Sequence, residues 1–380
     1  MTDTLFTIQE HNEYNGYDKL YPKTHASLIV NPPQATGARI DVLCLPASSG
    51  IVVNLSGQKT ASATTDSNGK CSFEGLDYGE YTISATISGS EKSETVSIDA
   101  SKIYDVSLGI SKTLNDNSWE VISAVSKAGL ASTYWSVGDA KAVTLNGTLA
   151  SGKTINKNLY VYIIDFNHTP SSSSGTPDGI SFCGFKSAQT NGIELALVDG
   201  QYNESISRST GFIMYTSGTN VGGWKNSYMR HSSLGSVKTS GSTYTSSTAV
   251  TEPLSNSLMS CLPSDLRTVM QLMYVYSDNT GGNSAPTPTI TSDYLILPSE
   301  FEVYGVSDAS DKAKQSQYTY WAQGNTRIRY NSNNNNNNAV WWLRTPLQSN
   351  SASFITILAT GFTSISAANR SLGIAPIFKV

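Results

Sequence analysis

Two strongly apolar blocks near the C-terminus constrain the fold of this chain most. Residues 340–346 contain two consecutive tryptophans, and residues 372–378 carry only apolar side chains and one glycine. Between the blocks, small polar side chains are interleaved with apolar ones, and residues 331–338 are all asparagine except Ser332. Large apolar side chains are mostly buried in folded proteins. We therefore expect the two blocks to form a rigid frame that presents the polar stretch between them as a recognition surface.

The polarity of the chain comes mainly from uncharged residues. Only 14% of the 380 residues are charged, against about 25% in typical globular proteins, and Ser, Thr, Asn and Gly make up the difference. With 20 tyrosines, this composition favours β-structure and an extracellular or virion surface. The net charge is −4 and no long basic block is present, which argues against nucleic acid or an anionic membrane as partner.

The cysteines and the N-terminus exclude several further classes. Four cysteines are scattered without the spacing of a zinc site or a disulfide framework, so we read them as small buried hydrophobes. We expect no metal and no cofactor. The N-terminus has no secretory signal pattern, and no run of about 18 apolar residues predicts a membrane span. A phage structural protein fits this combination, because it is made in the host cytoplasm and released by lysis.

Shifts in composition divide the chain into three parts, residues 1–46, 47–112 and 113–380. The first part is extended, proline-punctuated and poor in apolar residues. It is predicted to attach to other tail or baseplate proteins or to the other chains of a homotrimer. In the second part, short alternating strands and a tight-turn signal at residues 66–70 predict a small β-sandwich.

Residues 75–83 read Gly-Leu-Asp-Tyr-Gly-Glu-Tyr-Thr-Ile. This pattern resembles the carboxypeptidase-regulatory-like and collagen-adhesin B-type domains. The resemblance implies an immunoglobulin-like fold that serves as a spacer.

The third part mixes helices and strands, so the whole chain is expected to be mainly β with some α. Apolar spacing and capping residues predict helices, and β-branched or aromatic runs predict strands. The predicted helices cover residues 119–130, 222–230 and 263–273, and the predicted strands cover 141–145, 159–166, 179–185 and 193–198.

Six motifs follow one another in this third part. They are Tyr-Trp-x-x-Gly-Asp (134–139), Gly-Gly-Trp-x-x-Ser-x-Met-Arg (222–230), Leu-Pro-x-x-Leu-Arg (262–267), Leu-x-Leu-Pro-Ser-Glu-x-Glu-Val-x-Gly (295–305), Trp-Trp-Leu-Arg-Thr-Pro (341–346) and Gly-Ile-Ala-Pro-Ile-Phe (373–378).

This series resembles a family of uncharacterised domains that is frequent in phage tail proteins and bacterial surface proteins. Its ending resembles the C-type-lectin-fold variable domains that diversity-generating retroelements target. The resemblance implies a C-type-lectin-like α+β domain over roughly residues 115–380. Ala375 stands where the closing motif usually has an arginine, which puts in doubt any ion pair that the family makes there.

The resemblance implies core strands in the two apolar blocks and a binding face built from the chain between them. The residues support this independently, because short runs of mixed apolar and polar residues are joined by a hairpin turn signal at 360–361. If Ile355 and Ile357 face the core, alternation turns their neighbours outward, where rings, amides and hydroxyls suit an adaptable binding surface. The predicted ligand-binding residues are Arg344, Gln348, Asn350, Ser351, Ser353, Phe354, Thr356, Leu358, Phe362, Ser364, Ser366, Asn369 and Ser371.

Catalysis is not expected. No Gly-x-Ser-x-Gly motif is present, and His168 and His231 lie in unrelated polar stretches. Formylglycine-generating enzymes share the C-type-lectin fold, but they need two nearby cysteines, and none follows Trp341. The calcium-site triplet of lectins is not present either. Glu300 and Glu302 are expected to share one strand face in a structural role.

The function that these patterns favour is that of a phage tail-fibre or tail-tip protein. It would act on the virion as a homotrimer and bind a protein or glycan on the host cell. Two alternatives stay open, a bacterial surface or injection-system adhesin with the same tip and a structural virion decoration protein. The asparagine run is typical of a flexible low-complexity loop. Retroelement diversification also enriches asparagine, although the run lies upstream of the segment that is normally varied.

Overall fold

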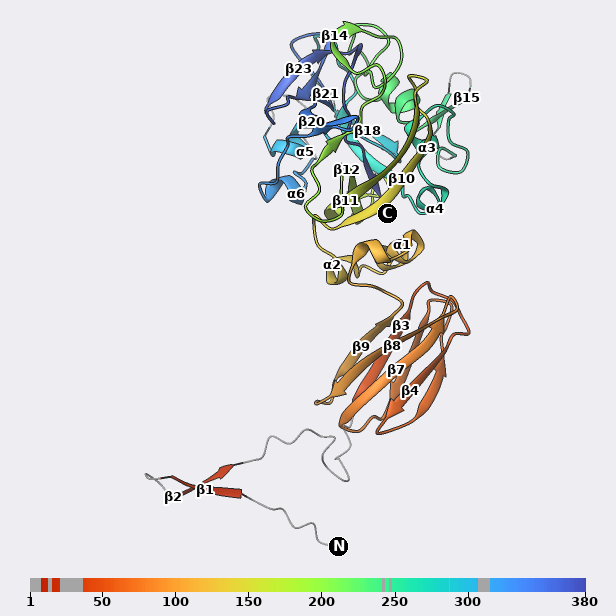
Figure 1. Cartoon of the computed structure of the whole chain (residues 1–380), viewed down its shortest axis with the longest axis vertical. Coiled ribbons are helices and arrows are strands. Elements are labelled where there is room, and N and C mark those ends of the chain that lie inside the picture. Colours follow the sequence, from red (N-terminus) through yellow and green to blue (C-terminus); the bar gives the residue numbers. More distant parts are fainter. Residues whose placement is uncertain are drawn as a thin grey trace. The chain divides into compact units, whose positions relative to one another are not determined.

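A computed structural model shows a mainly β protein of two compact units, Met1–Ile110 and Ser111–Val380 (Figure 1). Among the residues that it describes, no helix is long and apolar enough to cross a membrane. The described residues are 8–12, 16–20, 37–240, 243–245, 248–286, 288–306 and 315–380.

The first unit contains one isolated hairpin and a two-sheet sandwich. The hairpin pairs β1 (Ile8–Asn12) with β2 (Gly16–Leu20) in antiparallel fashion. The rest of the predicted attachment segment before residue 37 lies outside the described residues, so its role stays a prediction. The sandwich sheets are, in strand order, β6 (Lys70–Glu74), β3 (Arg39–Cys44) and β9 (Ile103–Leu108), and β5 (Ala61–Thr64), β4 (Val52–Gly57), β7 (Gly79–Ile87) and β8 (Ser90–Ile98).

Side chains from both sheets share one core. Along β3, Ile40, Val42 and Cys44 are buried in alternation, as the inner face of a two-layer sandwich requires. The turn after β5 contains Gly69 at φ +71°, and a Cβ there would lie 2.4 Å from the Cys44 carbonyl oxygen. Only glycine is compatible with both the positive φ and this close approach.

The predicted boundary at residue 47 was wrong. β3 precedes it and is the central strand of its sheet, antiparallel to β6 and parallel to β9. The proline-rich stretch upstream made the segment read as an extended arm. The alternation of Ile40, Val42 and Cys44 is the signal that assigns it to the sandwich. The immunoglobulin-like identity of this sandwich stays a prediction.

The second unit has short helices around several small sheets. Its longest α-helix, α1, confirms the predicted helix at 119–130, and the Ser118 hydroxyl caps it by accepting a hydrogen bond from the Val121 amide. The helices are η2 (Leu114–Asp116), α1 (Trp119–Lys127), α2 (Ala131–Tyr134), the π-helix η3 (Met229–Ser233), α3 (Leu258–Cys261), α4 (Ser264–Arg267), α5 (Glu300–Tyr304) and α6 (Thr319–Ala322).

The largest sheet of the second unit is antiparallel and has the order β10-β11-β12-β25. Its strands are β10 (Ala140–Thr148), β11 (Thr154–Pro170), β12 (Pro177–Lys186) and β25 (Ile377–Lys379). β25 brings the end of the chain into the core, where the Phe378 ring stacks on Phe182 with centroids 5.3 Å apart.

Five smaller sheets are found among the described residues of the unit. They are β21 (Trp341–Pro346), β22 (Ser353–Ile357) and β23 (Thr363–Ala367); β13 (Leu195–Ala196), β19 (Tyr330–Asn331) and β20 (Asn334–Asn338); β17 (Met273–Asp278) and β18 (Pro288–Asp293); β14 (Asn203–Ser207) and β24 (Arg370–Ser371); and β15 (Lys238–Ser240) and β16 (Thr243–Thr245).

Two predicted helices were wrong. The segment 263–273 forms the single turn α4 and then runs into β17 at Met273, because the apolar residues after Leu266 continue into a strand that pairs with β18. The segment 222–230 is mostly turn and enters η3 only at Met229. Gly222 and Gly223 have φ values of +92° and +51°, which a right-handed helix does not allow.

Candidate functional site

The two apolar blocks are buried, as predicted. The first forms β21, where the Trp342 indole donates a hydrogen bond to the Phe212 carbonyl oxygen at 2.9 Å and the Trp341 indole donates one to Arg327 at 3.1 Å. The second is buried over its whole length and ends in β25. Each indole thus buries its large apolar ring and still pairs its N–H group.

Arg344 was predicted to bind ligand, and this was wrong. Its side chain is fully buried, and two of its nitrogens lie 2.5 and 2.6 Å from the two carboxylate oxygens of Glu302. Burial alone would raise the pKa of Glu302, but the charge and hydrogen bonds of Arg344 outweigh burial and hold that pKa below its ordinary value. Glu302 lies on α5, not on the predicted strand, and its carboxylate also accepts the Ser299 amide in a capping box.

A second buried ion pair joins two other motifs. The Arg230 Nε atom lies 2.7 Å from the Asp293 carboxylate, which also accepts hydrogen bonds from Trp224 Nε1 at 3.3 Å and from Ser236 Oγ at 3.0 Å. The motif residues Trp224, Arg230 and Arg344 are therefore structural. We call Trp341, Trp342 and the pairs Arg344–Glu302 and Arg230–Asp293 the frame.

Four more predicted site residues are buried, so their predicted exposure was wrong. β22 is the middle strand of its sheet, and all of its residues are buried. On one face Phe354 packs against Trp342 and Tyr215, with ring centroids 6.5 and 5.9 Å away. Alternation predicts which residues share a face, but it does not show that something covers the second face. The four buried residues are Ser353, Phe354, Thr356 and Ser371.

The other predicted residues reach the surface to different degrees. Gln348, Asn350, Ser351 and Phe362 are exposed, whereas Leu358, Ser364, Ser366 and Asn369 are half-buried. Three of the four exposed residues lie in residues 347–352, which join β21 to β22 and which we call the rim loop.

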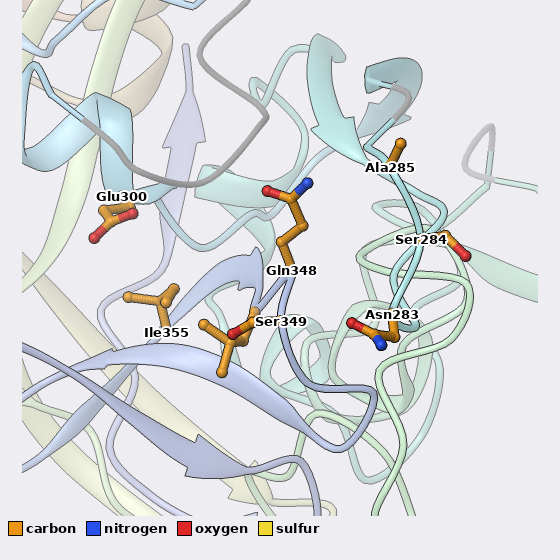
Figure 2. A pocket seen from close by; sticks show the side chains of 8 residues that line it. Asn283, Ser284, Ala285, Glu300, Gln348, Ser349 and Ile355 are labelled. Carbon is orange, nitrogen blue, oxygen red and sulfur yellow. The ribbon is translucent and has the colours of Figure 1, made fainter.

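The rim loop forms one side of a hollow of about 570 Å³. The Gln348 side chain extends into it, between Glu300 on one side and the segment from Asn283 to Ala285 on the other (Figure 2). Glu300 is the first residue of α5. The complete lining consists of Asn283, Ser284, Ala285, Glu300, Leu347, Gln348, Ser349 and Ile355.

Sequence reasoning missed the part of this lining that comes from other segments. Residues 277–289 are rich in Gly, Asn, Thr and Pro, but nothing in this composition places them beside Gln348. Glu300 was expected to share a strand face with Glu302 in a structural role.

Asn220 holds the two loops of the hollow in place. Its side chain is fully buried, and its Nδ2 group contacts the carbonyl oxygens of Leu347, Asn350 and Ser353 at 3.0, 2.7 and 2.8 Å. Its Oδ1 atom accepts a hydrogen bond from the Gly282 amide at 2.7 Å. One buried amide therefore fixes both the rim loop and the loop that carries Asn283.

The backbones of Gly281 and Asn220 also approach each other closely where these two loops meet. A Cβ at Gly281 would lie 1.8 Å from the Asn220 carbonyl oxygen, and Gly281 has φ +55°. Glycine is needed at this point for the backbones to meet. The sequence showed two adjacent glycines at 281–282, but not which segment they approach.

An apolar surface continues from the hollow onto β23. Ile355 is paired with Ile365 across the sheet, so both side chains lie on the same face. Ile365 is 52% exposed and Phe362, at the preceding turn, is 71% exposed. The predicted hairpin turn at 360–361 is confirmed, because Gly361 has φ +85° and donates its amide to Leu358.

The asparagine run lies beside this turn. Residues 334–338 form β20, an exposed strand at the edge of its sheet, so the predicted flexible loop was wrong. The Asn338 side chain donates a hydrogen bond to the Ala359 carbonyl oxygen at 2.8 Å, and the Tyr304 hydroxyl donates one to Gly361 at 2.6 Å. These two contacts fix the turn between β22 and β23.

Among the described residues, no three His, Cys, Asp or Glu side chains gather as metal ligands would. A comparison with curated proteins found no match to this chain. A family described as a domain of unknown function (DUF6273) does match, over residues 220–380. The matched part begins at Asn220 and includes both ion pairs of the frame and every residue that lines the hollow, so the chain is similar to this family over its whole candidate site.

Proposed function

We propose that this chain is a receptor-binding protein of a phage tail and that it recognises a host cell-surface ligand at the hollow and along β23. The observation that carries the proposal is the hollow itself. Three separate segments supply its lining, and the predicted residue Gln348 extends into it.

The volume of the hollow and the fixed positions of its loops are typical of a binding site. Its volume of about 570 Å³ lies within the range of roughly 300–1,000 Å³ typical of small-ligand sites. The Asn220 hydrogen bonds hold both loops before any ligand arrives. A preorganised site loses less entropy on binding.

The exposed residues of the rim loop are separate from the buried residues of β22, and this also supports recognition of ligands that vary between hosts. Gln348, Asn350 and Ser351 are exposed, whereas Ser353 and Phe354 next to them are buried. Substitution at the exposed positions therefore changes the surface and leaves the core packing intact. This is the arrangement that a retroelement-diversified binding domain requires.

The remaining parts of the proposal come from the sequence. The predicted attachment segment, which the sequence placed at residues 1–46 and which ends before β3, attaches the protein to other tail components. The sandwich acts as an immunoglobulin-like spacer, and the second unit has a C-type-lectin-like fold. A homotrimer would gain avidity from three individually weak sites.

The test is binding of the fluorescently labelled full-length protein to a panel of bacterial strains, measured by flow cytometry. We expect saturable binding to a subset of strains. The variant Gln348→Ala should lower the affinity about tenfold, since one polar contact to ligand is worth about 1.4 kcal/mol. The matched control Asn146→Ala changes an amide exposed on β10 and should bind like the wild type. Binding to no strain, or equal binding by both variants, contradicts the proposal.

A further inference from the structure

The lining of the hollow also indicates a class of ligand, and this inference rests on the proposed function. We infer that the hollow binds a short neutral carbohydrate. The argument uses the hydrogen-bonding groups, the apolar groups, the charge and the shape of the hollow.

The polar lining groups match sugar hydroxyls. A sugar hydroxyl both donates and accepts hydrogen bonds, so its best partners do the same. The carboxamides of Gln348 and Asn283 and the hydroxyls of Ser284 and Ser349 all have this double capacity. Gln348 and Asn283 lie on opposite loops (Figure 2), so one ring between them can contact amides on two sides.

The apolar lining groups suit the carbon face of a sugar ring. Leu347, Ala285 and Ile355 contribute aliphatic carbon to the same hollow. Ile365 extends this surface beyond Ile355 on the same sheet face and is 52% exposed. A sugar ring carries C–H groups on its faces and hydroxyls around its edge, and this lining offers partners for both.

The charge of the lining argues for a neutral ligand. Glu300 is the one charged side chain among the described residues that line the hollow. A carboxylate accepts hydrogen bonds from sugar hydroxyls through two oxygens. It repels sialic acids, uronic acids and phosphates, which need a basic partner.

The shape argues against a folded protein as the occupant of this hollow. A protein partner typically covers about 800 Å² on each side of the interface, mostly over flat surface. A hollow of about 570 Å³ between two fixed loops suits a small polar ligand that enters it.

Cell treatments distinguish the two kinds of receptor. Bacteria that bind the full-length protein are treated with periodate, which cleaves vicinal diols, or with a broad protease. We expect periodate to abolish binding and protease to leave it unchanged. Loss after protease together with survival after periodate would overturn the carbohydrate inference and leave the proposed function standing. No binding to the untreated cells would instead overturn the proposed function.

Purified glycans then test the charge argument. Neutral oligosaccharides from the bound strains, and the same oligosaccharides carrying uronic acid or phosphate, compete with cell binding. We expect the neutral series to compete and the acidic series to fail. Gln348→Ala should weaken competition about tenfold, and Asn146→Ala should leave it unchanged. Thermal melting of each variant verifies folding. Preferential competition by the acidic series overturns the inference.

The variant Glu300→Gln completes the test, because it removes the charge and keeps the size of the side chain. We expect weaker competition by neutral glycans, since a charged acceptor makes stronger hydrogen bonds than an amide. Unchanged competition in a folded Glu300→Gln protein excludes Glu300 from the site and overturns its assigned role.

Discussion

The frame and the hollow of the second unit use polar groups in opposite ways. In the frame, Arg344 and Arg230 are buried and paired with carboxylates at 2.5 to 2.7 Å. Among the polar side chains that line the hollow, all except Glu300 are uncharged amides or hydroxyls. Buried charges need fixed partners, whereas exposed amides can exchange partners with water or ligand. The buried charges of Arg344 and Arg230 thus hold the scaffold, whereas the polar side chains that line the hollow, apart from Glu300, are uncharged.

This difference teaches that a recognisable motif need not be a site. The motif tryptophans and the arginines Arg230 and Arg344 are buried. The uncharged polar residues that line the hollow lie in loops. The following predictions test this division, from the largest expected effect to the smallest.

The variant Arg344→Met should destabilise the second unit severely. It removes the guanidinium but leaves the Glu302 carboxylate buried, and an unpaired buried charge costs about 3–5 kcal/mol. Chemical denaturation measures the free energy of unfolding. The control Arg370→Met removes a half-buried arginine on β24 and should cost under about 1 kcal/mol. Equal stability of the two variants would break the assignment of Arg344 to the frame.

The variant Asn220→Ala should damage the hollow more than the fold. It deletes one buried amide that makes four hydrogen bonds to two loops, which we expect to cost about 2–3 kcal/mol. Ligand binding should fall more than tenfold, because the loops lose their common anchor. Calorimetric melting and cell binding give the two readouts. Full binding by Asn220→Ala would show that the loops are positioned without it.

The stability of the second unit should depend on pH through His168. Its ring stacks on Tyr318 with centroids 3.6 Å apart and lies 3.0 Å from the Ser316 carbonyl oxygen. Burial lowers its pKa, although the charges of Glu302 and Asp165 act in the opposite direction. The folded protein therefore binds this proton less readily than the unfolded chain, whose histidine has a pKa of about 6.5.

The sign of the effect follows from this difference. The contribution of the neutral His168 ring to the free energy of unfolding is complete above a pH of about 6.5. It is lost as the pH falls below that value, and the free energy of unfolding then changes by at most about 1.4 kcal/mol per pH unit. The variant His168→Phe keeps an aromatic ring that can stack on Tyr318 and removes the titratable imidazole. Urea unfolding from pH 7.5 to 5.5 should show a flatter pH dependence for His168→Phe than for wild type. Parallel curves would contradict the assignment to His168.

Local sequence patterns determined much of the fold. Alternating apolar residues located strands such as β7, a nearly continuous apolar run located β11, and an amphipathic pattern located α1. The apolar blocks around Trp341 and Ile374 predicted burial correctly. These features were readable because each depends on residues that are neighbours in the chain.

Only the tertiary structure decided which surfaces remain open. Phe354 and Thr356 are buried because Trp342, Tyr215 and their neighbours cover a strand face that alternation predicted to be free. Asn283 joins Gln348 in the hollow because Asn220 ties loops that lie more than sixty residues apart. Glu300 joins them from α5, where its amide donates a hydrogen bond to the Thr345 hydroxyl. Burial and site geometry depend on contacts between distant segments, and the sequence of a single chain does not state which segments meet.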